Sequence, residues 1–300
     1  MRFKGIIFDF DGTLANLTID FDRIKRKILL LKDIFVEDRG IEIEVPDLPL
    51  LECIERLTDD IKKFDLDLAK EFNTRCRLIL VDMEMRAARR GKLFDYTYEI
   101  LDKCKKNGAK VAVVTRNCTP AVKMVFPDIE DTIDVFLPRE EVLRVKPDPN
   151  HIETALKKLG TKKQESIMIG DHPIDIMCAK RAGVISGAVA TGNTPIEDLK
   201  KEHPDFVAKD LLELFANLEE NLDQGDTYVY SSALEVEKIE DEVVYCKVGE
   251  GTVQASLLLM DEEVKVGDYV LIHAGFAIRR LEEEDAKQTL DLIKEALQPG

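Results

Sequence analysis

The feature that most constrains the fold of this 300-residue chain is a repeated alternation of short apolar strands with helices. It begins near residue 95 and continues to about residue 222. The predicted strands are residues 110–114, 133–137, 166–169, 187–190 and 206–207. Alternation of this kind produces right-handed strand–helix–strand units and a mainly parallel sheet. The sequence therefore predicts an α/β fold for this part of the chain.

Another apolar run, residues 5–8, is followed at once by Asp9, Phe10, Asp11 and Gly12. Ligands bind at the C-terminal ends of strands in open α/β sheets. Two carboxylates crowded at such a point need a cation to neutralise them or must hold a proton. Mg²⁺ suits them because it is a hard cation that shares its coordination shell with phosphate. With a metal present, Asp9 can attack phosphorus and Asp11 can protonate the leaving oxygen. The competing interpretation is a plain Asp-Gly turn.

Two later segments offer groups for a phosphate. Thr115 and Arg116 follow the strand at 110–114, and a hydroxyl beside free backbone N–H groups can bind phosphoryl oxygens. Lys146 stands before Pro147, just ahead of a predicted helix at 150–159. A lysine near two aspartates can offset their charge and anchor phosphate. A simple strand end and a solvated surface lysine are the alternatives.

A second pair of carboxylates follows the strand at 166–169. Gly170 and Asp171 end this strand, and Asp175 lies four residues later in the first turn of a helix. Carboxylates at this spacing share one helical face and can hold one cation. A helix cap is the alternative interpretation of Asp171.

Taken together, DFDGTL at residues 9–14, the strand that ends in Thr115, Lys146 before proline, and GDxxxD at 170–175 resemble the four motifs of the haloacid-dehalogenase-like (HAD) phosphohydrolases. The resemblance covers residues 1–220. It implies a Rossmann-like core with an aspartyl-phosphate on Asp9, which water attacks with Asp11 as general base. The implied metal is Mg²⁺, held by Asp9, the backbone carbonyl of Asp11, and Asp171, with Asp175 as a ligand or a support. The implied phosphate-binding residues are Gly12, Thr115, Arg116 and Lys146.

Residues 16–92 differ from the rest because they are almost entirely helical in pattern. Helices are predicted at 21–39, 47–57 and 60–90, with one short strand at 41–45. The HAD-like family carries a helical cap over the substrate at this position. The expected domains are therefore a core formed by residues 1–15 and 93–222, with residues 16–92 as its cap. The cap decides the substrate, and its sequence does not identify one.

From residue 223 the pattern changes to valine and tyrosine alternating with charges. Strands are predicted around 234–239 and at 243–248, 252–260 and 268–278, forming an antiparallel sheet or small barrel. An amphipathic helix with Ala286, Leu290, Ile293 and Leu297 on one face closes this domain, residues 223–300.

The segments at 266–278 and 281–286 resemble the HypC/HupF family of hydrogenase-maturation chaperones, over residues 228–296. That family forms a small β-barrel with a C-terminal helix and binds a partner protein and an iron centre. His273 stands at its functional histidine. The stretch around Val229 lacks its cysteine, and a lone histidine cannot replace a thiolate in holding iron. We therefore expect protein docking or self-association here.

The composition limits the kinds of binding partner and the cellular compartment that we expect for this protein. Lys and Arg number 43 against 59 Asp and Glu, for a net charge of −16, which argues against nucleic acid or an anionic membrane as the main partner. Six scattered cysteines fit reduced thiols, and no apolar run is long enough to cross a bilayer. These features predict a cytoplasmic protein.

The sequence as a whole predicts a Mg²⁺-dependent phosphatase that hydrolyses a small phosphomonoester. Phosphoryl transfer or mutase chemistry through the same intermediate is an alternative enzyme function. A non-catalytic accessory scaffold in hydrogenase maturation is the alternative from a different class.

Overall fold

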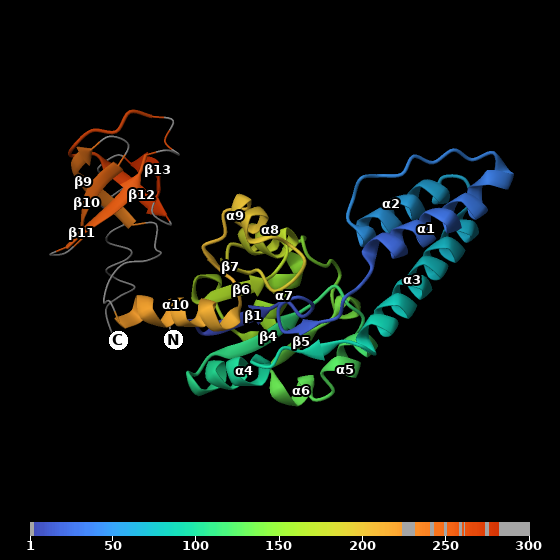
Figure 1. The fold of residues 1–300 in the computed structure, drawn as a ribbon. Helices are drawn as coiled ribbons and strands as arrows, with labels where there is room; N and C mark the ends of the chain where they lie inside the picture. Colours follow the sequence, from blue (N-terminus) through green and yellow to red (C-terminus); the bar gives the residue numbers. More distant parts are fainter. Residues whose placement is uncertain are drawn as a thin grey trace. The chain divides into compact units, whose positions relative to one another are not determined.

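The computed structural model describes residues 3–223, 232–240, 243–248, 251–257, 260, 262–273 and 276–281. The chain divides into two compact units, Met1–Glu219 and Glu220–Gly300 (Figure 1). Among the described residues, none of the helices combines the length and the apolar character that a membrane span requires. We describe each unit separately.

The first unit is built on a six-stranded parallel sheet, which confirms the predicted α/β fold. The order of its strands is β5-β4-β1-β6-β7-β8. Their bounds are β1 Gly5–Phe8, β4 Lys110–Val114, β5 Val135–Leu137, β6 Ser166–Gly170, β7 Ile185–Val189 and β8 Phe206–Ala208. In the centre, Phe8 of β1 is level with Val113 of β4 and Ile169 of β6. The residues that follow these three strands therefore emerge side by side at one edge of the sheet.

Alternating side chains of the strands pack against two layers of helices. On β1, Ile6 and Phe8 belong to a core shared with α4 (Thr97–Lys106) and α10 (Leu211–Asp223). Ile7 belongs to a second core on the opposite face, shared with α7 (Asn150–Leu159) and α8 (Pro173–Ala182). The sheet is covered on both faces, which is why its strands are continuous apolar runs. The shorter helical elements are α5 Thr119–Val125, α6 Ile129–Thr132, α9 Ile196–Lys201, η2 Arg139–Glu141 and η3 Lys163–Glu165.

Three helices between β1 and β4 form a bundle to one side of the sheet (Figure 1). They are α1 Phe21–Val36, continued by the 3-10 turn η1 Glu37–Arg39, α2 Leu50–Lys62 and α3 Leu66–Ala88. Where the chain leaves the core and returns to it, β2 (Ala15–Asn16) pairs with β3 (Lys92–Leu93) in an antiparallel ribbon.

Two sequence predictions for this segment were wrong. The break between the second and third helices lies later than predicted, because the Asp65 carboxylate accepts hydrogen bonds from the backbone N–H groups of Asp67 and Leu68 and caps α3 there. No strand forms at residues 41–45, since a short strand is stable only beside a partner and the described sheets offer none at this point.

The second unit contains a closed five-stranded barrel in the order β10-β11-β13-β12-β9. Its strands are β9 Ser232–Glu240, β10 Val243–Val248, β11 Gly251–Ser256, β12 Tyr269–His273 and β13 Phe276–Leu281. The interior is apolar and includes Val236, Val244, Cys246 and Val270. The segment predicted as one strand at 268–278 is instead two antiparallel strands, β12 and β13. The predicted terminal helix and Val229 lie outside the described residues.

A buried ion pair joins the helical bundle to the core. Glu84 of α3 bonds the Arg139 guanidinium in η2, and its other oxygen accepts a hydrogen bond from the backbone N–H of Cys118 at 3.1 Å. The two side chains are only 4% and 6% exposed. Removing one partner of such a pair leaves an uncompensated buried charge.

We therefore expect Glu84→Gln to lower the free energy of unfolding by about 3–5 kcal/mol, measured by urea denaturation. Glu71→Gln on the same helix is the matched control, because Glu71 pairs with Arg75 at the surface, where both side chains are about half exposed. Its cost should stay below about 1 kcal/mol. Equal effects of the two substitutions would show that the buried pair does not hold the bundle to the core.

Candidate active site

A cavity of about 810 Å³ lies where the C-terminal ends of the central strands face the helical bundle. Most of the predicted site residues line it: Asp9, Asp11, Gly12, Arg116, Lys146, Asp171 and Asp175. They come from the turn after β1, the segment after β4, the segment before α7, and the junction of β6 with α8. Thr115 is the predicted residue that does not line the cavity.

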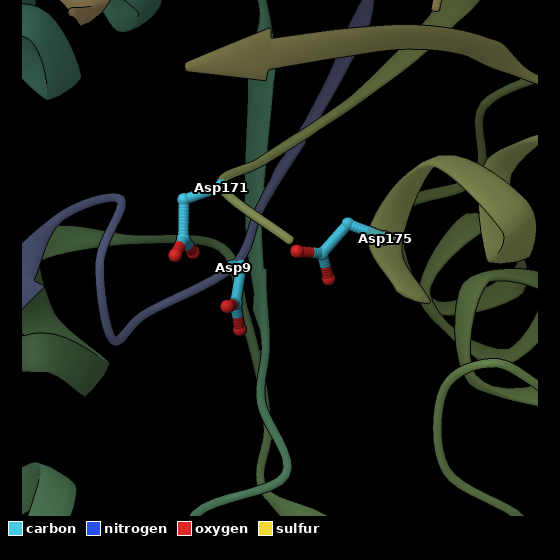
Figure 2. A group of neighbouring side chains, drawn as sticks. All are labelled: Asp9, Asp171 and Asp175. Atoms are coloured by element: carbon cyan, nitrogen blue, oxygen red, sulfur yellow. The ribbon is translucent and has the colours of Figure 1, made fainter. Parts of the chain in front are cut away.

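Three carboxylates meet at the floor of the cavity. Asp9, Asp171 and Asp175 each place an oxygen within 4.8 Å of the others (Figure 2). Asp9 is fixed by its backbone N–H, which donates to the Ile169 carbonyl at 2.8 Å and continues the pairing of β1 with β6. Asp175 is fixed by the start of α8, where one of its oxygens accepts a hydrogen bond from the backbone N–H of His172 at 3.1 Å. The register of the sheet and a helix start therefore bring together carboxylates that are distant in sequence.

The Lys146 ammonium binds two of these carboxylates. Its Nζ lies 2.6 Å from Asp9 Oδ1 and 2.6 Å from Asp175 Oδ1, and the side chain is almost completely buried. Burial lowers the pKa of Lys146, but the charges of Asp175 and Asp9 outweigh that effect and hold the pKa above its usual value. Lys146 is therefore a fixed positive charge at the centre of the site.

One lysine does not neutralise all the carboxylates that surround it. Burial is the main cause that raises the pKa of Asp9 to about 7, with Asp175 adding repulsion. Burial, followed by the charges of Asp9, Asp175 and Asp11, raises the pKa of Asp171 to about 9. Burial also raises the pKa of Asp11 to about 6. Several carboxylates that resist ionisation at one point are a suitable site for a divalent cation, which takes oxygen ligands.

Glycines leave the space that these carboxylates occupy. A Cβ on Gly170 would lie 2.3 Å from Asp175 Cγ. On Gly12 and Gly192 it would lie 2.2 Å and 1.8 Å from Asp171 Oδ2. Gly12 also has a φ of +83°, a conformation that favours glycine. The small residues at these points allow the backbone to close around the carboxylate cluster, so the donor set and its enclosure fit a small hard cation such as Mg²⁺.

Asp11 faces the same cavity but stands apart from the three-carboxylate group. Its Oδ1 accepts a hydrogen bond from the backbone N–H of Leu17 at 2.9 Å, which fixes the side chain in the turn after β1. A carboxyl with a pKa near 6 can both give and take a proton close to neutral pH.

In the segment after β4, the side chains of Thr115 and Arg116 bond to other residues of the protein, whereas the simplest expectation was that both are free to bind phosphate. Thr115 is buried, and its hydroxyl donates to Asn117 Oδ1 at 2.7 Å while accepting from the backbone N–H of Asn117 at 3.1 Å. It is Asn117 that lines the cavity. Arg116 lines it too, but its guanidinium donates to both Glu52 oxygens, at 2.8 and 2.7 Å, and to the Lys146 carbonyl.

Sequence reasoning missed several residues of the cavity wall. Asn117, Thr191 and Gly192 line it, and the Thr191 hydroxyl donates to the carbonyl of Gly12. Thr191 and Gly192 come soon after the end of β7, as Thr115 comes after the end of β4. The sequence signal that could have identified them is a polar residue and a glycine after an apolar run. His172 caps α8 at the cavity rim.

Comparisons with known proteins agree with this arrangement. The sequence model of the Haloacid dehalogenase-like hydrolase family matches residues 6–189, and that of the HupF/HypC family matches residues 232–293. A PpaX protein of Caldanaerobacter subterraneus subsp. tengcongensis, named as a pyrophosphatase, is 30% identical over 220 residues, which are 71% of this chain and 94% of that one. Pyrophosphatase PpaX of Halalkalibacterium halodurans is 26% identical, over 71% of this chain and 96% of its own.

Among solved structures, a haloacid dehalogenase-like hydrolase from Bacteroides fragilis is similar in fold, with a TM-score of 0.50 and 22% identity. The match covers 71% of this chain and all of that one.

The raised carboxylate pKa values predict how stability depends on pH. A carboxyl whose pKa is higher in the folded than in the unfolded protein stabilises the fold below the unfolded value, near 4, and that contribution is lost as pH rises through the folded value. For Asp9 and Asp171, this stabilisation is lost progressively as the pH rises from the unfolded value to about 7 and about 9, respectively. In EDTA, the melting temperature should therefore fall as pH rises from 5 to 9.

Saturating Mg²⁺ should remove most of this fall, because a bound cation stabilises the ionised carboxylates. Asp171→Asn should also reduce it, without Mg²⁺. The same pH dependence with and without Mg²⁺ would contradict a cation site among these carboxylates.

Proposed function

Because this chain belongs to the haloacid dehalogenase-like hydrolase family, we propose that it is a Mg²⁺-dependent phosphatase that hydrolyses a small phosphomonoester through an aspartyl-phosphate on Asp9. The observation that carries the proposal is the position of Lys146 between Asp9 and Asp175, with Asp171 beside them at the cavity floor. A non-catalytic scaffold has no use for buried carboxylates whose mutual repulsion costs stability.

In the first step, an Asp9 oxygen attacks phosphorus, and the bond between phosphorus and the leaving oxygen breaks. Asp11 gives its proton to the leaving oxygen, so the leaving group departs as an alcohol. In the second step, water attacks phosphorus and loses a proton to Asp11, while the bond between phosphorus and Asp9 breaks. Inorganic phosphate leaves, and Asp9 and Asp11 return to their starting protonation states.

Three groups of residues support these steps. Asp9, Asp171 and Asp175 would hold Mg²⁺ together with the Asp11 backbone carbonyl, and the bound ion would lower the repulsion between the carboxylates and the phosphoryl oxygens. Lys146 supplies a fixed positive charge for a phosphoryl oxygen. The turn at Gly12 brings backbone close to the same point, and Arg116 and Asn117 contribute to the cavity wall after β4. The Thr115 hydroxyl holds the Asn117 side chain there.

We assign residues 1–15 and 93–222 to the catalytic core and residues 16–92 to its cap. The basis for the cap is that α1, α2 and α3 all contribute residues to the cavity wall, among them Phe21, Leu50 and Leu80. A cap in that position can exclude water from the phosphoryl group while the ester is cleaved.

For residues 223–300 we propose protein docking or self-association. The closed barrel and the match to the HupF/HypC family support a binding role. The sequence lacks a cysteine near Val229, so we do not assign iron to this domain.

Release of inorganic phosphate from an aryl phosphate tests the catalytic proposal. Asp9→Asn should lower kcat by at least about a thousandfold, because the nucleophile is lost. Asp11→Asn should lower it about 10²–10⁴-fold through loss of the general acid and base. EDTA should abolish the activity and Mg²⁺ should restore it.

Asp198→Asn is the matched control, because Asp198 lies at the surface on α9 and pairs with Lys201. It should leave the rate unchanged. If no phosphate ester is turned over and a hydrogenase-maturation protein co-purifies with the chain, the scaffold function replaces the phosphatase.

A further inference from the structure

The part of the cavity wall above the carboxylates is mostly apolar. Phe21, Pro49, Leu50, Leu51 and Leu80 contribute to it from the helical bundle, and Ile174 contributes from α8. Under the proposed function, the phosphoryl group binds at the cavity floor and its leaving group extends toward this wall. Apolar side chains gain from contact with an apolar leaving group and give a charged one nothing to bind.

Of the three lysine and arginine side chains in the described part of the wall, two are paired with carboxylates of the protein. The third has a carboxylate one turn away on its own helix. The cations there are Lys25, Arg116 and Lys146. Lys146 binds Asp9 and Asp175 at the cavity floor. Lys25 lies one turn after Asp22 on α1, and Asp22 lines the cavity as well.

Arg116 is a cation of the cavity wall that could bind a second anionic group, but its guanidinium is paired with Glu52. Both Glu52 oxygens accept hydrogen bonds from the two terminal nitrogens of Arg116, at 2.8 and 2.7 Å. The two side chains are 27% and 21% exposed, so the pair is shielded from water more than a surface ion pair. Paired hydrogen bonds of this kind satisfy both the charge and the planar geometry of a guanidinium.

We propose that Glu52 is a specificity-determining residue, which by neutralising Arg116 selects phosphomonoesters with an uncharged, largely apolar leaving group. This inference rests on the proposed phosphatase function and names its substrate class. A leaving group that carries a carboxylate or a second phosphate would face a largely apolar wall, and the Arg116 guanidinium in that wall is already paired with Glu52. Pyrophosphate, the substrate class in the names of the PpaX relatives, is therefore a poor substrate for this chain.

The test compares benzyl phosphate with 4-carboxybenzyl phosphate, which differ by one remote carboxylate and have leaving oxygens of similar basicity. Pyrophosphate is the third substrate. For the wild type we expect kcat/KM to be at least about tenfold higher for benzyl phosphate than for either anionic substrate. In Glu52→Gln, which keeps the size of the side chain and removes its charge, the ratio of 4-carboxybenzyl to benzyl phosphate activity should rise about tenfold or more.

A double variant, Glu52→Gln with Arg116→Gln, distinguishes the effect of a released Arg116 charge from the effect of a displaced cap. It removes the guanidinium as well as the ion pair between the bundle and the core, so the gain with 4-carboxybenzyl phosphate should disappear. A gain that persists in the double variant would mean that an opened cap, and not a released Arg116, admits the anionic substrate, and would overturn the proposal.

The wild-type measurements separate failure of this inference from failure of the proposed function. If the wild type prefers 4-carboxybenzyl phosphate or pyrophosphate, the phosphatase stands and the substrate class is wrong. If none of the three substrates is hydrolysed and a wider set of phosphate esters also gives no release, the proposed function itself fails, and this inference with it.

Discussion

The rest of the site depends on the ion pairs that the Lys146 ammonium forms with two carboxylates. The ammonium binds Asp9 after β1 and Asp175 at the start of α8, and without it the carboxylate cluster would carry uncompensated negative charge. His151 supports the backbone of this lysine. The His151 ring is fully buried; its Nδ1 lies 3.2 Å from the Lys146 backbone N–H and accepts from it, so the other nitrogen, Nε2, carries the proton and donates to the Leu137 carbonyl at 3.0 Å. Burial, aided by the Lys146 charge, lowers the pKa of His151 to about 3 and keeps the ring neutral.

Two ion pairs connect the helical bundle to the core, and their surroundings give them different consequences. Glu84 and Arg139 are buried, and the Cys118 N–H binds the remaining Glu84 oxygen, so this pair is part of the packing between α3 and the core. Glu52 and Arg116 are partly exposed, and Arg116 lines the cavity. Their bond is weaker for that reason. Under our proposal, it sets the charge that a substrate meets. Stability and specificity are thus assigned to separate contacts between the same two parts of the chain.

Local patterns in the sequence predicted the elements that position the site. The strand at Lys110–Val114 and the helix at Asn150–Leu159 begin and end where predicted, because buried apolar runs and a glycine after the helix specify them locally. The carboxylates that the structure brings together were predicted for the same reason, since Asp9 and Asp171 each follow an apolar run and Asp175 lies in the first turn of the next helix. The partners of Arg116 and Thr115 could not be predicted. Glu52 lies on a helix far away in sequence, and the Thr115 hydroxyl turns to Asn117 instead of the cavity. The Arg116 contact depends on how the bundle packs on the core.

The central claim is that Asp9 becomes phosphorylated during turnover, and chemical trapping tests it most directly. Turnover with benzyl phosphate and Mg²⁺ is stopped with acid, and the protein is treated with borohydride, which reduces an acyl phosphate to the alcohol. Mass spectrometry of the peptide that contains Asp9 should then show homoserine at position 9, only when both substrate and Mg²⁺ were present. Phosphate release at a normal rate with unmodified Asp9, under quench conditions that trap a known aspartyl-phosphate, would contradict the account and indicate direct attack by water.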